Sequence, residues 1–392
     1  MPKSSVIQVH SPTIRLMIAS QAGPLELDSR SAALPLPQGP DGDALLLHYG
    51  PYLNSLRDLL LRDGFDLLIQ VVSRRSGSPV SASDLRGMDI ISEKHGAFYN
   101  VACARVFLAD HDYAFALTSA VTDFQKAIMT REAQALQEVQ AILAEDLLPR
   151  LRFEGEAQYV DKKNGPRMLK VLITDWLDDF HEFHLCRTQP DQPLATAVWH
   201  ESRGRLVLSA SQTAEAYRKA ARLLTLCYDT ASGRQVYPWH HAAGDFVIRC
   251  DDESLDVRLI SVRDYKRLIH EDGEDQNPLL GLLHFFLNLT LRMRLDRLDG
   301  TGDLAWMGRP CLDACAAGFL DACRVKHAQS SRFPDAPEIL GVLQSFDEIE
   351  LYELLQIAAA DGLIEPDEAP FLGQHLAEHA GELSQLLATV GA

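Results

Sequence analysis

The order of hydrophobic periods between residues 88 and 176 constrains the fold of this chain more than any other feature. Three apolar runs of strand character come first, separated by two short polar bends. Residues 124–145 then carry apolar side chains at helical spacing, and residues 157–176 form two apolar runs on either side of Asn164-Gly165, which is a strong hairpin signal. The segment therefore predicts three strands, one long helix and a hairpin.

The residues before this segment predict a small N-terminal α/β extension over residues 1–84. It has a strand-like start, a helical stretch that stops at Gly64, and an apolar run over residues 65–75 whose composition predicts β-structure.

The residues after the segment predict a larger, mostly helical part. We expect a helix from about Ser211, as its N-cap, to Asp229 and then a short hairpin that turns at residues 252–254. Helices follow from Asn277 onward, including two or three amphipathic helices in residues 335–392. The predicted fold class is α+β, with divisions near residues 84, 180 and 334.

Composition excludes several classes of protein. The chain is 46% hydrophobic and 23% charged, which is typical of soluble globular proteins. No apolar run reaches the ~18 residues that span a bilayer, and the first ten residues do not resemble a secretory signal. The seven cysteines lie in apolar surroundings without a C-x-x-C pair, which predicts reduced thiols in a cytoplasmic protein.

The distribution of charge indicates which partners to expect. The net charge is −18, and residues 335–392 contain twelve acidic residues and no Lys or Arg. That segment therefore carries −12 and the first 334 residues carry −6. Nucleic acids and anionic membranes are poor partners for such a chain, because both bind through Lys and Arg. A basic protein is the partner that residues 335–392 would attract.

The element order over residues 85–330 resembles the protein-kinase-like superfamily, in particular its aminoglycoside phosphotransferase and choline kinase branch. The resemblance implies a bilobal fold, with an N-lobe in residues 85–180 and a C-lobe in residues 181–334, and it implies binding of ATP and magnesium. Gly96 falls in the hairpin that covers the phosphates, and Asp175 in the segment that links the lobes. The acid that pairs the nucleotide lysine would be Glu132 or Glu138.

The C-terminal matches lie around residues 237–248, an unusual run with two adjacent histidines. Gly244-Asp245 resembles the Gly-Asn pair that follows the catalytic loop, so the resemblance implies that Asp245 binds the metal ion. Asp264 would be a second metal ligand. The proton-handling group would be His240 or His241, since imidazole carries protons near neutral pH. The alternative for these side chains is structural: hydrogen bonds to the backbone and a turn cap.

Three departures from the family pattern favour a second hypothesis. The third strand has Thr118 or Ser119 where the family has its lysine, the metal-aspartate position is Ser261, and no aspartate stands in the catalytic loop. Phosphoryl transfer depends on such charge-handling groups. The chain could therefore be an inactive, kinase-like interaction protein whose residues 335–392 dock a basic partner.

Two further clusters of charged or metal-binding side chains are candidate sites. His181 and His184, with His240 and His241, could form the metal site of a hydrolase, but on a strand the first two would lie on opposite faces. Arg292, Arg294 and Arg297 could bind phosphate, but we interpret them as the salt-bridged end of a helix, near Asp296 and Asp299.

Overall fold

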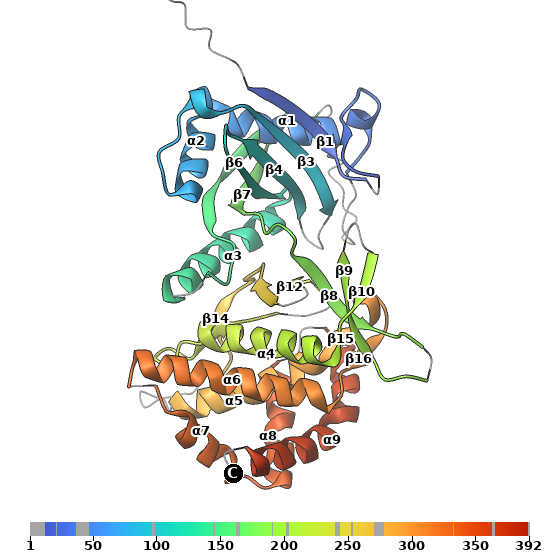
Figure 1. Ribbon diagram of the computed structural model, residues 1–392, viewed down its shortest axis with the longest axis vertical. Helices are drawn as coiled ribbons and strands as arrows, with labels where there is room; N and C mark the ends of the chain where they lie inside the picture. The colour runs from blue at the N-terminus through green and yellow to red at the C-terminus, as the bar shows by residue number, and fades with distance from the viewer. Residues whose placement is uncertain are drawn as a thin grey trace, which may run out of the picture. The chain divides into compact units, whose positions relative to one another are not determined.

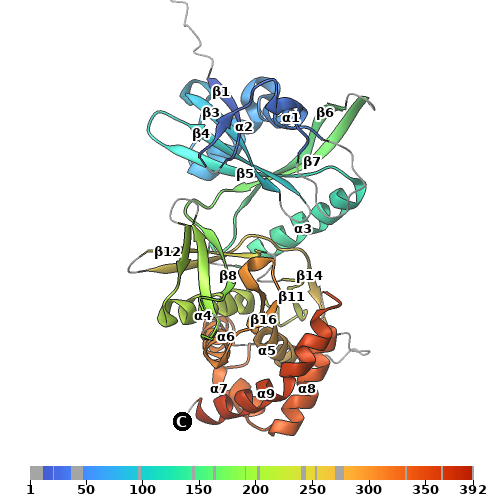
Figure 2. The same ribbon diagram turned by 90° about the vertical axis from the view of Figure 1, so that its right-hand side faces the viewer.

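The computed structural model describes most of the chain as a mixed α/β protein, divided into two compact units (Figures 1 and 2). Unit 1 comprises Met1–Ala133 and Pro149–Asp178, and unit 2 comprises Gln134–Leu148 and Asp179–Ala392. The described residues are 12–20, 22–36, 47–95, 99–143, 146–161, 165–189, 191–200, 204–239, 244–251, 254–269, 278–331, 333–362 and 365–390.

Unit 1 is built on one seven-stranded sheet with the strand order β2-β1-β3-β4-β5-β7-β6. Only the β1–β3 pair is parallel; the other neighbours are antiparallel. Residues 13–26, expected in a separate extension, thus share a sheet with the strands after residue 84. The strands are β1 (Thr13–Ile18), β2 (Leu25–Glu26), β3 (Gly87–His95), β4 (Asn100–Phe107), β5 (Asp112–Ala120), β6 (Leu151–Asp161) and β7 (Gly165–Asp175).

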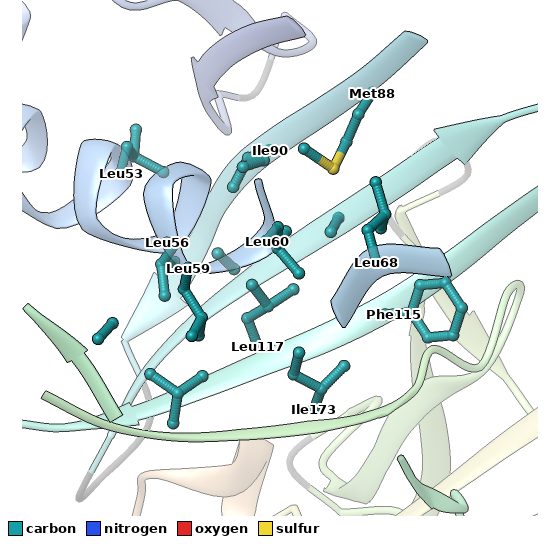
Figure 3. Packing of buried hydrophobic residues seen from close by; sticks show 14 of the residues in the cluster. Leu53, Leu56, Leu59, Leu60, Leu68, Met88, Ile90, Phe115, Leu117 and Ile173 are labelled. Atoms are coloured by element: carbon teal, nitrogen blue, oxygen red, sulfur yellow. The ribbon is translucent and has the colours of Figure 1, made fainter. Parts of the chain in front are cut away.

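Helices α1 (Tyr49–Leu60) and α2 (Arg62–Ser76) pack against one face of this sheet. Leu56 and Leu60 of α1 meet Leu117 of β5 and Ile173 of β7 in a buried core (Figure 3). The first half of α3 (Asp123–Ile142) packs on Leu172, whose side chain points to the opposite face because strand residues alternate. The predicted order of three strands, a helix and a hairpin is therefore confirmed.

The β-structure expected over residues 65–75 is wrong, because these residues form most of α2. Leu68, Val71 and Val72 are buried at helical spacing, whereas Leu67 and Ile69, on either side of Leu68, are only half-buried. The unbroken apolar run concealed this helical periodicity, and packing against the sheet decided the conformation.

Unit 2 contains a five-stranded antiparallel sheet with the order β10-β9-β8-β12-β13. Helix α4 (Ala210–Cys227) packs on it, with Tyr217 edge-on to Phe183. The cap of α4 is Ser209 and not Ser211, because Ser209 and Gln212 form a reciprocal capping box. The strands are β8 (His181–Cys186), β9 (Ala195–His200), β10 (Gly204–Val207), β12 (Phe246–Cys250) and β13 (Leu255–Leu259).

The helices expected after residue 277 are present, interrupted by one short hairpin. They are α5 (Pro278–Arg294), α6 (Arg309–Gln329), α7 (Ala336–Leu343), α8 (Glu348–Asp361) and α9 (Glu368–Thr389). The hairpin between α5 and α6 consists of β15 (Leu295–Arg297) and β16 (Leu304–Trp306), and a second small sheet pairs β11 (Arg234–Val236) with β14 (Tyr265–Arg267).

Arginines near the end of α5 hold the acidic C-terminal helices in place. Buried Arg292 pairs with buried Glu368 at 3.1 Å, and buried Arg294 pairs with Glu382 at 2.6 Å. Arg297 pairs with Glu365 and Asp367. The salt-bridge interpretation of these arginines is therefore confirmed, but the carboxylates that pair with them come from residues 365–382.

Arg294 also organises the surrounding side chains. Its guanidinium donates hydrogen bonds to the carbonyl of Met307 and to Nδ1 of His379. The same guanidinium lies over the Trp306 ring. Burial and the charge of Arg294 hold the pKa of His379 well below its usual range. His379 is therefore a neutral acceptor, with its Nε2 at 3.1 Å from Thr290.

All seven cysteines are free, and all but Cys250 are buried. Burial raises the pKa of Cys227 and of Cys323 to about 12, so these thiols stay protonated. Within the described residues, we find no helix that combines the length and the apolar character needed to cross a membrane.

We predict that Glu368→Ala lowers the free energy of unfolding by about 3–5 kcal/mol, because it leaves the buried Arg292 guanidinium without its carboxylate. The measurement is urea unfolding followed by circular dichroism. Glu365→Ala is the matched control: its side chain is 48% exposed, and its loss should cost less than about 1 kcal/mol. Equal losses in the two variants would contradict the prediction.

Candidate functional site

The candidate site lies in unit 2, where the residues before β12 meet β8 and the segment after β13. Gly244 and Asp245 immediately precede β12, and Ser261, Arg263 and Asp264 lie between β13 and β14. His240 and His241, the predicted proton-handling groups, lie outside the described residues, and so does Gly96.

Asp245 is a buried carboxylate, with a side chain only 3% exposed. Its Oδ1 atom accepts hydrogen bonds from Ser261 Oγ at 2.5 Å and from the Arg263 guanidinium at 3.0 Å. The backbone carbonyl of Asp245 accepts from the N–H of Ile260, which fixes the two segments side by side. The charge of Asp245 is thus balanced by Arg263 from the same unit.

Asp264, the predicted second metal ligand, makes a local contact. Its Oδ1 accepts from the N–H of Tyr265 at 2.8 Å, and its carbonyl accepts from the N–H of Tyr237. These bonds join β14 to the segment before β12. Among the residues that the structure describes, no group of three or more His, Cys, Asp or Glu side chains could hold a metal ion.

A second charged cluster lies on β8, beside Gly244. His184 is buried between two carboxylates: its Nδ1 lies 3.5 Å from Asp296 and its Nε2 lies 3.7 Å from Glu182. Asp296 is held in turn by the N–H groups of Leu185 and Arg297. Only one of these three side chains, Glu182, reaches the surface, at 31% exposure.

Two glycines allow the chain to approach this cluster closely. Gly244 has a φ of +68°, and a Cβ there would lie 2.8 Å from the Glu182 carboxyl carbon. Gly300 has a φ of +80°, and a Cβ there would lie 2.9 Å from His184 Nε2. Both positions therefore require glycine for conformation and for space. The close approach of Gly244 to Glu182 is visible only in the structure, because the sequence does not show which side chain lies beside a glycine.

His184 carries a positive charge at neutral pH. Burial opposes that charge most strongly, but the hydrogen bonds and negative charges of Asp296 and Glu182 together outweigh it and raise the pKa of His184 to about 9. The cluster is therefore an ion triad that joins β8 to β15.

His181 does not join this triad. It lies three residues from His184 on one continuous strand, so the two side chains point to opposite faces. The His181 ring packs on His200 of β9 at a centroid distance of 4.4 Å. The strand geometry thus separates the two histidines that a single metal site would have required.

Asp175, predicted to lie in the segment that links the lobes, forms ion pairs in unit 1. Both of its carboxylate oxygens accept from Arg152 at 2.7 Å, and Arg75 lies at 3.3 Å. The pairs join the end of β7 to β6 and to α2. Asp175 is buried, so these arginines supply the charge that its carboxylate needs.

The two glutamates predicted to pair a lysine lie on α3. Glu132 is half-buried, and Glu138 forms an ion pair with Arg234 of β11. Strand β5 contains no lysine. A lysine that sequence analysis did not single out, Lys170 of β7, reaches α3 and bonds to Thr130 and to Glu154 at 2.6 Å each.

Comparison with known proteins gave no match for this chain, either to a protein-family model or to a curated protein.

We predict that the contribution of His184 to the stability of the protein is lost at alkaline pH. Its pKa is higher in the folded state than the ordinary 6.5, so its contribution is complete below about pH 6.5 and is lost as pH rises through 9. In urea unfolding, the difference in unfolding free energy between the wild type and His184→Gln should shrink by roughly 1–3 kcal/mol between pH 6.5 and 9.5.

His111→Gln is the control, because His111 is exposed in the turn before β5. This variant should differ from the wild type by the same small amount at every pH. A pH-independent difference for His184→Gln would contradict the assignment of a charged imidazole.

Proposed function

We propose that this chain is a kinase-like binding protein that does not transfer phosphoryl groups. Support for the kinase-like part comes from the order of elements. Unit 1 has three antiparallel strands, β3 to β5, then α3, then the β6–β7 hairpin, with β7 next to β5. Unit 2 continues with α4, the β12–β13 hairpin and helices. The resemblance to the protein-kinase-like superfamily rests on this same order.

The observation that carries the non-catalytic part is the bonding of Asp245. Kinase-type chemistry relies on carboxylates that hold magnesium against the phosphates. In this chain the Oδ1 atom of Asp245 accepts hydrogen bonds from Ser261 and from Arg263. A magnesium ion at that oxygen would meet the positive guanidinium and would have to displace the hydrogen bonds from Ser261 and Arg263.

The position where the kinase-like family has its metal-binding aspartate agrees with this proposal. Ser261 stands there, and its hydroxyl donates to Asp245. A hydroxyl in place of a carboxylate removes one negative charge, which lowers the affinity for a divalent cation. At the expected metal site, Asp245 therefore accepts hydrogen bonds from both Ser261 and Arg263.

Two charged side chains that could have formed a lysine–glutamate pair for a nucleotide have other partners. Glu138 pairs with Arg234, and Lys170 pairs with Glu154. Neither contact requires a nucleotide. As a binding protein, the chain would act through its surface, and its charge favours a basic protein partner at residues 335–392.

We predict that ATP, ADP and GTP, each at about 2 mM, do not raise the melting temperature of the protein in a magnesium-dependent way. A ligand present at a hundred times its Kd stabilises the native state by about 2.7 kcal/mol, which is a visible shift in a thermal unfolding scan. The comparison is between 10 mM magnesium chloride and EDTA, on the wild type and on Asp245→Asn.

A magnesium-dependent shift in the wild type that is absent in Asp245→Asn would overturn the proposal and support a phosphotransferase. Asp245→Asn keeps the shape of the side chain and removes the charge. It should melt at a lower temperature than the wild type by the same amount with and without magnesium, because the ion pair between Asp245 and Arg263 is lost in both conditions.

A further inference from the structure

Helix α8 has a buried inner side and an outer side that is exposed to solvent. The inner side, Leu351, Leu355 and Ala358, is buried, and α8 packs against α5 and α9. The opposite side is exposed to solvent. We define the α8 face as the exposed residues Ile349, Glu350, Glu353, Gln356 and Ile357.

Two isoleucines on this face are exposed without a structural reason. Ile349 is 71% exposed and Ile357 is 56% exposed. They are eight residues apart, so they lie along one side of the helix with Glu353 between them. Single exposed apolar residues are ordinary. An aligned pair of β-branched residues that adds neither to the core nor to helix propensity indicates a surface that is covered by a partner.

The charge around the isoleucines has one sign. Asp347, Glu348, Glu350 and Glu353 lie within one stretch of seven residues, and the segment from residue 335 to the C-terminus has no Lys or Arg. Asp347 and Glu350 form the capping box of α8 by accepting backbone N–H groups, and both side chains remain exposed, so their charges stay at the surface. Farther along the chain, Glu368 and Glu382 are satisfied by α5 arginines, so they add little to the negative potential outside.

We propose that the α8 face binds a basic amphipathic helix of a partner protein. Apolar side chains of that helix, spaced three and four residues apart, would cover Ile349 and Ile357, and flanking Lys or Arg would pair with Glu350 and Glu353. The inference rests on the binding function proposed above and specifies its partner. A second copy of this chain would bring two acidic faces together, and an anionic lipid surface would be repelled.

The test uses the full chain and a designed peptide. A fluorescein-labelled Leu/Lys peptide of about 14 residues with helical amphipathic spacing is titrated with protein, and fluorescence anisotropy is recorded. The second probe is a scrambled peptide of identical composition, which has the same charge but no apolar face. We expect the amphipathic peptide to bind about fivefold or more tightly than the scrambled one.

Two double variants locate the contact. Ile349→Ser/Ile357→Ser should weaken binding by about fivefold or more, since it removes the apolar anchors. Glu350→Gln/Glu353→Gln should weaken binding about threefold and reduce its dependence on salt; glutamine at position 350 keeps the capping box. The matched controls are Val160→Ser, 62% exposed on β6, and Asp110→Asn/Asp112→Asn, both exposed. The controls should bind like the wild type.

Equal affinity for the two peptides, or equal affinity of the α8 variants and the controls, would overturn the proposal. So would a wild-type dimer in sedimentation equilibrium that Ile349→Ser/Ile357→Ser dissociates, because the face would then bind a second copy. Circular dichroism and melting temperature confirm that each variant is folded. A magnesium-dependent rise in melting temperature with a nucleotide would contradict the non-catalytic function but would leave the peptide affinities unchanged. The failure of one proposal can therefore be told apart from the failure of the other.

Discussion

The charged interior of this protein depends on one interaction, the pairing of a buried carboxylate with a cationic side chain of the same unit. Asp175 is held by Arg152, Asp245 by Arg263, Glu368 by Arg292 and Asp296 by His184. A carboxylate that leaves water without such a partner would be protonated or would destabilise the fold. Each pair also joins segments that are distant along the chain, so the pairs fix how β7, β12, α5 and β15 lie within their units.

This pairing changes how the roles of the acidic residues are interpreted. In the sequence, Asp245 looks like a metal ligand and residues 335–392 look like an acidic tail. In the structure, Asp245 completes an internal pair, and several tail carboxylates anchor α9 and the residues before it to the arginines of α5 and β15. The negative charge that remains for a partner is concentrated at the start of α8. The functional proposal follows from this separation between charges that hold the fold together and charges that stay at the surface.

Much of the fold was predictable because local patterns and tertiary packing agree. The periodicity of residues 88–176 located β3, β4, β5, α3 and the β6–β7 hairpin, and strand alternation placed His181 and His184 on opposite faces. The prediction of β-structure for residues 65–75 was wrong because a helix buried on one side can have the composition of a strand. The site was less predictable. Arg263 is 18 residues from Asp245, Asp296 is 112 residues from His184, and no local pattern links such pairs. The fit of Gly244 against Glu182 likewise appears only in three dimensions.

The most direct test of the account is a double-mutant cycle for Asp245→Asn and Arg263→Gln, measured by urea unfolding in EDTA and again in 10 mM magnesium chloride. If Arg263 takes the place of a metal ion, the two side chains should show a coupling energy of about 1–3 kcal/mol, and magnesium should leave it unchanged. A coupling energy near zero would contradict the account. So would a wild type that magnesium stabilises while Asp245→Asn does not respond, because Asp245 would then be a metal ligand.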